Sequence, residues 1–121
     1  MADAATEGMT GAKRFYEGNA RAMRPVREGM PEAIQGFVGL HHAAMKPGEL
    51  ATREKELIAL GISIAVRCEP CIYSHVQAAA KAGATRAMIL ETAAVSLMMA
   101  GGPGYTYMPR VVEALEALGM E

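Results

Sequence analysis

The sequence predicts an all-α fold of about six helices in a single domain, and three observations support this. Val and Ile are scattered inside runs rich in Ala, Leu, Met and Glu, which favours helix over strand. Apolar residues recur at helical spacing, and Pro and Gly stand between the apolar runs. No internal repeat or linker divides the chain. The expected domain therefore covers residues 10–121, after a frayed segment of residues 1–9.

Prolines delimit the first two expected helices. Thr10 suits the N-cap of a helix that runs to about Met23 and is broken by Pro25. Pro31 suits the first turn of a second helix, which ends at the breaker of residues 46–48. This second helix carries one apolar stripe at helical spacing, made of Ile34, Phe37, Val38, His41 and Met45. We expect the stripe to pack in a core or an interface.

The remaining helices lie between further breakers. Thr52 and Thr85 are the expected N-caps of the third and fifth helices, and Gly83 ends the fourth. The run Gly-Gly-Pro-Gly at residues 101–104 predicts a turn; it lacks the Lys and Ser/Thr of a phosphate-binding loop. The third helix should stop at the interruption at residues 67–70, and the others should cover about 70–82, 85–100 and 107–118.

Composition excludes several classes of function. The formal charge of -1 gives no reason to expect nucleic acid or an anionic membrane surface as a partner. No signal peptide is expected, and the apolar stretches are too short to span a bilayer, so the sequence predicts a soluble cytoplasmic protein. A small chain that is 51% hydrophobic is also expected to bury surface between subunits.

The two cysteines of the chain, Cys68 and Cys71, stand three residues apart. Pro70 has no N–H to offer and fits a first helical turn, which puts Cys68 near the N-cap and Cys71 in the first turn. Positions three apart in a helical turn have Cα atoms roughly 5 Å apart, a separation that a disulfide tolerates. In a cytoplasmic protein such a pair is more often catalytic or metal-binding than structural.

Two further residues are expected to assist the thiols. His75 lies one helical turn after Cys71, where it can accept the thiol proton, and the helix N-terminus also favours a thiolate. If the third and fourth helices form a hairpin, Glu56 comes level with residues 77–78, about one turn from His75. A carboxylate near a histidine orients the ring and strengthens it as a base. This predicts a relay from Glu56 through His75 to Cys71, directly or through a water.

Glu56, Cys68, Cys71 and His75 form the pattern E-x11-C-x2-C-x3-H, and residues 53–60 read Arg-Glu-Lys-Glu-Leu-Ile-Ala-Leu. Over residues 50–97 the chain resembles the carboxymuconolactone decarboxylase superfamily, in particular its AhpD-like alkylhydroperoxidase branch. The resemblance implies an all-helical subunit of a homotrimer or homohexamer. It also implies a thiol-dependent oxidoreductase that reduces a peroxide or a disulfide. We expect no cofactor and no metal.

In the implied scheme one thiolate attacks the peroxide and the other cysteine then forms the disulfide. A dithiol partner, either a lipoyl group or a thioredoxin-like protein, restores the thiols. We expect Cys71 to attack, because His75 shares its helix face, and Cys68 to resolve; the reverse order stays open because the N-cap also favours a thiolate. Members of the peroxidase branch often carry a histidine between the cysteines, where this chain has Pro70.

Other readings compete with this one. The cysteines can be packed structural thiols, or two ligands of a zinc site that would need more ligands than one chain supplies. His75 can be a satisfied buried histidine, and Glu56 a solvated helix residue. At the level of the whole protein, the alternatives are a carboxymuconolactone decarboxylase-type enzyme without thiol redox chemistry and a non-catalytic oligomeric module that senses oxidants.

Overall fold

A computed structural model describes residues 9–121 of the chain. Those residues form helices and no strand, as the sequence predicts. The helices are α1 (Gly11–Gly29), α2 (Pro31–Met45), α3 (Thr52–Ala65), α4 (Glu69–Lys81), α5 (Arg86–Ala100), α6 (Gly102–Tyr105) and α7 (Met108–Ala117). The expected fraying of residues 1–9 falls, for residues 1–8, outside the described residues. None of the described helices is both long and apolar enough to cross a membrane.

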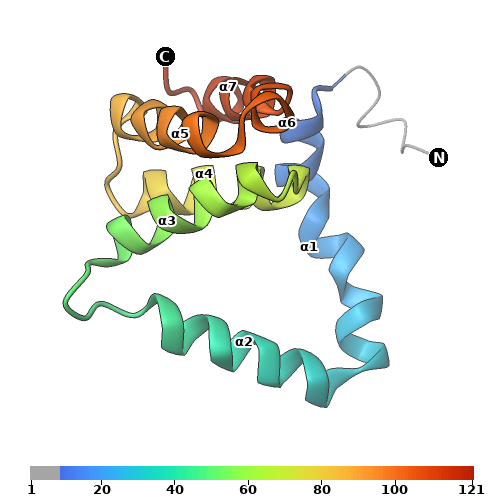
Figure 1. Cartoon of the computed structure of the whole chain (residues 1–121). Helices are drawn as coiled ribbons and strands as arrows, with labels where there is room; N and C mark the ends of the chain where they lie inside the picture. The colour runs from blue at the N-terminus through green and yellow to red at the C-terminus, as the bar shows by residue number, and fades with distance from the viewer. Residues whose placement is uncertain (1–8) are drawn as a thin grey trace.

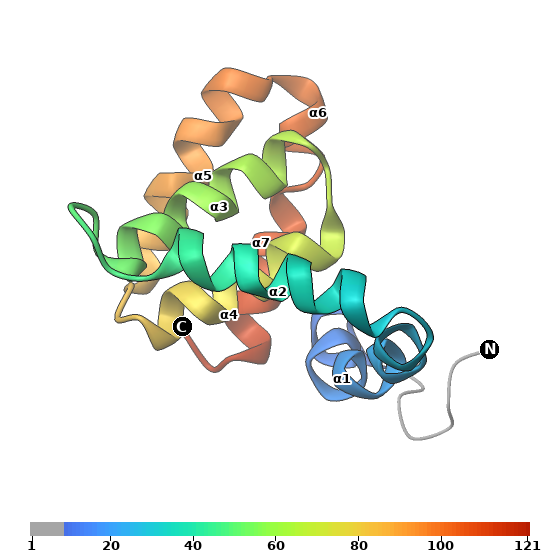
Figure 2. The ribbon, with the colours of Figure 1, turned by 90° about the horizontal axis from the view of Figure 1, so that it is seen from below.

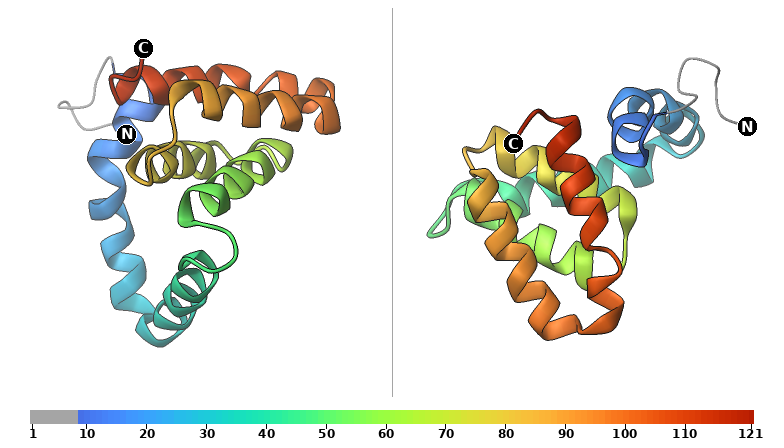
Figure 3. Two further views of the ribbon diagram at one scale, coloured as in Figure 1. Left: turned by 90° about the vertical axis from the view of Figure 1, so that its left-hand side faces the viewer. Right: turned by 90° about the horizontal axis from the view of Figure 1, so that it is seen from above.

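The helices from α3 onward form two layers (Figure 1). The pair α3 and α4 makes one layer, and α5 with α7 lies across it (Figure 3). The first half of α1 packs against α4 and α7, and its second half extends away from the layers (Figures 1 and 3). The α3–α4 layer therefore has one face covered by α5 and α7 and another turned toward α2.

The buried core lies where these layers meet. Leu60 and Ile64 of α3, Ile72 and Val76 of α4, and Ile89 of α5 are fully buried. The other core residues are Ala12, Tyr73, Ala79, Ala84, Ala93, Val111, Ala114 and Leu115. Many of them are small, so the helices approach closely, and burial of this apolar surface is the main force that holds α3 and α4 in a fixed relation.

Three sequence-based expectations are wrong in detail. Pro25 does not break the first helix: α1 continues to Gly29, and Pro25 lies in its exposed half, where a missing backbone N–H costs less than in a buried turn. Thr52 is the first residue of α3 rather than its cap, and its hydroxyl donates to the carbonyl of Met45 across the loop at 3.0 Å. The expected turn at residues 101–104 contains the start of the short helix α6.

Helix α2 lies below the α3–α4 layer in Figure 1, separated from it, and crosses in front of it in the view from below in Figure 2. It begins at Pro31 and ends before Lys46, as predicted, but none of its side chains is buried. Its apolar stripe therefore finds no core within the described residues: Phe37 is 68% exposed and Val38 is 41% exposed. His41 is exposed as well. The end of α2 is nevertheless fixed, because Lys55 Nζ donates to the carbonyls of Ala44 and Lys46.

Candidate functional site

The turn between α3 and α4 places Cys68. The N–H of Arg67 donates to the carbonyl of Ile64 at 3.0 Å, and the N–H of Cys68 donates to the carbonyl of Ser63 at 3.0 Å. These two bonds make a Schellman motif, in which the residue after the C-cap takes the left-handed conformation. Arg67 occupies that position with φ 57°, and it is the one non-glycine residue of the described chain with positive φ. The backbone of Cys68 is therefore tied to the end of α3.

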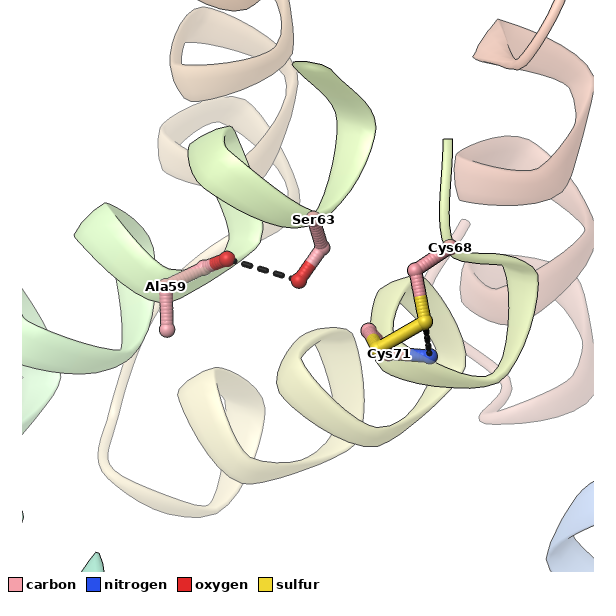
Figure 4. The surroundings of a disulfide bond; sticks show 4 residues. All are labelled: Ala59, Ser63, Cys68 and Cys71. Carbon is pink, nitrogen blue, oxygen red and sulfur yellow. Dashed lines mark hydrogen bonds between the residues drawn. A yellow bond between two sulfur atoms is a disulfide. The ribbon is translucent and has the colours of Figure 1, made fainter. Parts of the chain in front are cut away.

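Cys68 is also the N-cap of α4, as the sequence predicts, and its Sγ accepts the N–H of Cys71 at 3.3 Å. The two cysteines form a disulfide, with Cα atoms 5.2 Å apart (Figure 4). Both residues are partly exposed. The partial positive charge of the helix N-terminus acts at this sulfur and favours a thiolate over a thiol when the bond is reduced.

Glu56 and His75 meet across the α3–α4 pair. Oε2 of Glu56 lies 2.7 Å from Nδ1 of His75. The Glu56 side chain is 6% exposed and that of His75 is 22% exposed, so the carboxylate lies inside while the ring reaches the surface. The sequence had placed Glu56 about one turn from His75; the α3–α4 packing brings them into direct contact without a water. Because Nδ1 is hydrogen-bonded to the Glu56 carboxylate, Nε2 is the ring nitrogen that is available to exchange a proton with another group.

All four predicted site residues belong to α3, α4 or the turn that joins them. Cys71 and His75 are separated by one turn on α4, so their side chains share a face of that helix. The arrangement supplies a dithiol at a helix N-terminus and an imidazole oriented by a buried carboxylate. Such a set can form a thiolate, make and break a disulfide, and exchange a proton one helical turn from Cys71.

Sequence reasoning missed two contributions to the site. Ser63 is buried and lies beside the disulfide in Figure 4, where its hydroxyl donates to the carbonyl of Ala59 at 2.7 Å while its own carbonyl holds Cys68. Glu69 lies between the cysteines in sequence and accepts a hydrogen bond from the hydroxyl of Tyr73 at 2.8 Å. Its carboxylate also forms an ion pair with Arg110 of α7 at 3.3 Å. Buried positions in helical runs give no sequence signal for such contacts, and Arg110 is too distant in the chain to be paired by pattern.

The hydroxyl of Tyr73 stays protonated as a donor in this cluster. Burial raises the pKa of Tyr73, and the hydrogen bond to Glu69 raises it further. The ring itself lies in the core at 2% exposure. Tyr16 of α1 donates to the backbone carbonyl of Tyr73 at 2.6 Å, which ties α1 to the helix that carries the cysteines.

The other histidines do not join the site. His41 and His42 are exposed on α2, with ring centroids 6.0 Å apart. Within residues 9–121, no three His, Cys, Asp or Glu side chains are grouped so that they could hold a metal ion.

Residues 31–118, which contain α2 to α7 and the whole of this site, match the carboxymuconolactone decarboxylase family. The chain belongs to that family. An uncharacterized protein of Cupriavidus necator is similar to this chain, with 33% identity over 91 residues. The matched region spans 75% of this chain and 80% of that protein.

Solved structures agree with this assignment to the carboxymuconolactone decarboxylase family. A family protein of Legionella pneumophila in its apo form has a TM-score of 0.78 at 37% identity, over 89% of this chain and 94% of that chain. A family protein of Thermotoga maritima, whose description proposes a part in the antioxidative response, has a TM-score of 0.74 at 29% identity. It matches 83% of this chain and 88% of its own.

Proposed function

We propose that this protein is a thiol-dependent oxidoreductase of the alkylhydroperoxidase type, which reduces a peroxide or a disulfide through Cys68 and Cys71. The observation that carries the proposal is the arrangement on α3 and α4. Two cysteines within disulfide distance stand at a helix N-terminus, and His75, one turn further, is bonded to the buried Glu56. Each of these features serves thiol redox chemistry, and together they leave no site residue without a role.

In the first step His75 accepts the proton of the Cys71 thiol at Nε2, and the imidazolium is stabilised by the Glu56 carboxylate. The Cys71 thiolate attacks one oxygen of the peroxide, and the O–O bond breaks. Cys71 becomes a sulfenic acid, and the leaving alkoxide takes the proton from His75 and departs as an alcohol. The sulfur is oxidised by two electrons and the peroxide is reduced by two.

In the second step the Cys68 thiol condenses with the sulfenic acid, which releases water and forms the disulfide. The N–H of Cys71 points at the sulfur of Cys68, so little backbone movement is needed for the pair to close or reopen. A partner dithiol, a lipoyl group or a thioredoxin-like protein, then exchanges with the disulfide and is itself oxidised. The cytoplasm, where thiols are kept reduced, suits such a cycle.

The paired cysteines favour this activity over a lactone decarboxylase reaction within the same family, because that reaction has no use for a dithiol. A proposed antioxidative role for the Thermotoga maritima relative is in line with this choice. Pro70 stands where a further histidine often lies in the peroxidase branch, so His75 is the proton carrier of the proposed mechanism.

The working form is proposed to be a homo-oligomer, a trimer or a hexamer, in which a second copy of the chain covers α2. Helix α2 buries none of its side chains, and the largest apolar ones it exposes are Phe37 and Leu40. An apolar helix face of this kind is a surface that a second copy of the chain can cover.

A second apolar surface supports the same proposal. Ile62 of α3 and Val95 and Met99 of α5 are 58%, 61% and 75% exposed and line a groove of about 450 Å³ between the two helices. The groove contains no charged side chain. An uncharged groove and an almost uncharged exposed helix in one chain are the pair of surfaces that an assembly of identical copies can bury.

The activity is tested by a coupled assay of the reduced protein with a panel of hydroperoxides and several dithiol donors. Consumption of peroxide that depends on the donor, and that is lost in Cys71→Ser, supports the proposed function. Peroxide consumption by Cys71→Ser at the wild-type rate, or no consumption with any donor and no disulfide exchange, contradicts it.

A further inference from the structure

A charged cluster lies on the face of α4 turned away from His75. Tyr73 lies two positions from both Cys71 and His75, and Glu69 lies two positions before Cys71. Two positions correspond to about 200° around the helix. Tyr73 donates to Oε1 of Glu69 at 2.8 Å, and Oε2 of Glu69 pairs with Nε of Arg110 at 3.3 Å. The Arg110 guanidinium also pairs with Glu113 at 3.3 Å.

The cluster is built to fix the direction of one carboxylate. Its parts come from three helices, because the N–H of Ala12 in α1 donates to Oε1 of Glu113 at 3.2 Å. Gly11 approaches so closely that a Cβ there would lie 2.7 Å from the Tyr73 hydroxyl and 2.9 Å from Oε1 of Glu69. Glu69 beside it raises the pKa of the Arg110 guanidinium, which therefore keeps its charge. Glu69 is thus held toward α7 and α1.

The position of the Glu69 carboxylate affects the stability of a thiolate at the neighbouring cysteines. Glu69 is the first residue of α4 and stands between the two cysteines in sequence. A carboxylate in the first turn is attracted to the positive end of the helix. The same positive end stabilises the thiolate of a cysteine placed there, so an unpaired carboxylate at Glu69 would oppose the thiolate.

We propose that Arg110, by pairing with Glu69, is a positioning residue that sets the balance between the dithiol and disulfide forms of Cys68 and Cys71. The inference rests on the proposed function in so far as it requires the pair to cycle. Without Arg110, the charge of Glu69 acts on the reduced cysteines and disfavours their thiolate form. Without the charge of Glu69, the thiolate is more stable, and the equilibrium therefore shifts toward the reduced form of the cysteine pair.

The test measures the equilibrium of the protein with glutathione. The protein disulfide and two glutathione thiols give the protein dithiol and one glutathione disulfide, so two electrons and two protons are exchanged. Arg110→Gln is expected to lower this equilibrium constant by about three- to tenfold, which is about 15–30 mV for a two-electron couple. Glu69→Gln is expected to raise it by a similar factor, and the double variant to return within about twofold of wild type.

A matched control separates charge at the site from loss of an exposed ion pair. Arg53 pairs with Glu54 in the first turn of α3 at 2.8 Å, with side-chain exposures of 41% and 36%. The Arg110–Glu69 pair has exposures of 40% and 41%. Arg53→Gln should therefore remove a comparable pair and leave the glutathione equilibrium unchanged. Circular dichroism verifies that each variant is folded.

The outcomes distinguish this inference from the proposed function. Opposite shifts for Arg110→Gln and Glu69→Gln that cancel in the double variant support the inference, even if no peroxide is consumed. Equal constants for all variants, or shifts in the same direction, overturn it, even if peroxidase activity is found. A wild-type disulfide that does not exchange with glutathione overturns both.

Discussion

Oε2 of Glu56 lies 2.7 Å from Nδ1 of His75, and this contact joins α3 to the helix that carries the cysteines. The Glu56 side chain is 6% exposed, so the carboxylate is largely removed from water. Burying a carboxylate costs folding free energy unless the carboxylate is hydrogen-bonded. His75 therefore stabilises Glu56 in its buried position, and Glu56 in turn orients the ring of His75. The ring is thereby held with Nε2 directed away from the carboxylate.

The first prediction concerns this pair. His75→Ala should slow alkylation of the reduced protein by iodoacetamide at pH 7 and lower kcat/KM for peroxide by about 10²-fold, because no group then accepts the thiol proton. Glu56→Gln keeps the shape but not the charge and should give a smaller loss in the same direction. Stopped-flow alkylation and a coupled peroxide assay measure both effects.

His42→Ala is the matched control for that experiment. His42 is exposed on α2 and makes its ring contact with His41 rather than with the site. Its removal should leave the alkylation rate unchanged. An alkylation rate in His75→Ala equal to that of wild type would remove His75 from the mechanism.

The second prediction assigns the cysteines. With Cys68→Ser, Cys71 should react once with peroxide and stop as a sulfenic acid, because the resolving thiol is missing. Dimedone should then label Cys71, as read by mass spectrometry after proteolysis. With Cys71→Ser, no burst of peroxide consumption is expected. Dimedone labelling of Cys68 in Cys71→Ser, with a burst of wild-type size, would reverse the order of attack.

Much of the fold could be predicted from the sequence because its signals are local. Pro31 marks the start of α2, and Thr85 caps α5 by accepting the N–H of Met88 at 3.2 Å. The α3–α4 hairpin needs only the interruption at residues 67–70, and from it the approach of Glu56 to His75 follows. Family membership, read from the cysteines and those two residues, is confirmed by the match over residues 31–118.

The parts that could not be predicted depend on contacts between distant residues. Whether Pro25 breaks a helix depends on whether the surrounding turn is buried, and here it is exposed. The hydroxyl of Thr52 does not cap α3, because it donates a hydrogen bond to the carbonyl of Met45 across the loop. Glu69 and Arg110 form an ion pair because the fold brings α4 and α7 together, and no sequence motif links the two positions. Sequence periodicity carries none of this information.

The third prediction follows from the strained turn before Cys68. Three helices end in the same Schellman motif; the left-handed residue is Gly83 after α4 and Gly119 after α7, but Arg67 after α3. A side chain in this conformation costs about 1–2 kcal/mol, of which part is offset by the greater freedom of glycine in the unfolded chain. Arg67→Gly should therefore raise the free energy of unfolding by about 0.5–1 kcal/mol.

Urea denaturation of the oxidised protein measures that change. Arg86→Gly is the comparison, because Arg86 is also exposed but lies in the first turn of α5. Glycine there should lower the free energy of unfolding by up to about 1 kcal/mol. If Arg67→Gly destabilised the protein as much as Arg86→Gly, the turn would not be strained.

The fourth prediction uses two glycines of α1. A Cβ at Gly11 would lie 2.7 Å from the Tyr73 hydroxyl, whereas a Cβ at Gly18 would meet no atom within 4 Å. Gly11→Ala should cost about 1–3 kcal/mol, because the cluster around Glu69 must shift. Gly18→Ala should gain about 0.5–1 kcal/mol from helix propensity. Thermal unfolding of both variants checks the opposite signs, and a gain at both positions would contradict the close approach of α1 to the cluster.

The last prediction concerns the exposed helix α2. Wild-type protein should show a light-scattering mass that is a multiple of 12.8 kDa at micromolar concentration. The reason is that the exposed side chains of Phe37 and Leu40 would be buried against a second copy of the chain. The double variant Phe37→Glu/Leu40→Glu places charge on that surface and should shift the mass toward that of one chain. Val112→Glu, at a position 38% exposed on α7, should leave the mass unchanged. A wild-type mass near 12.8 kDa would show that α2 stays uncovered, and the proposed assembly would then be wrong.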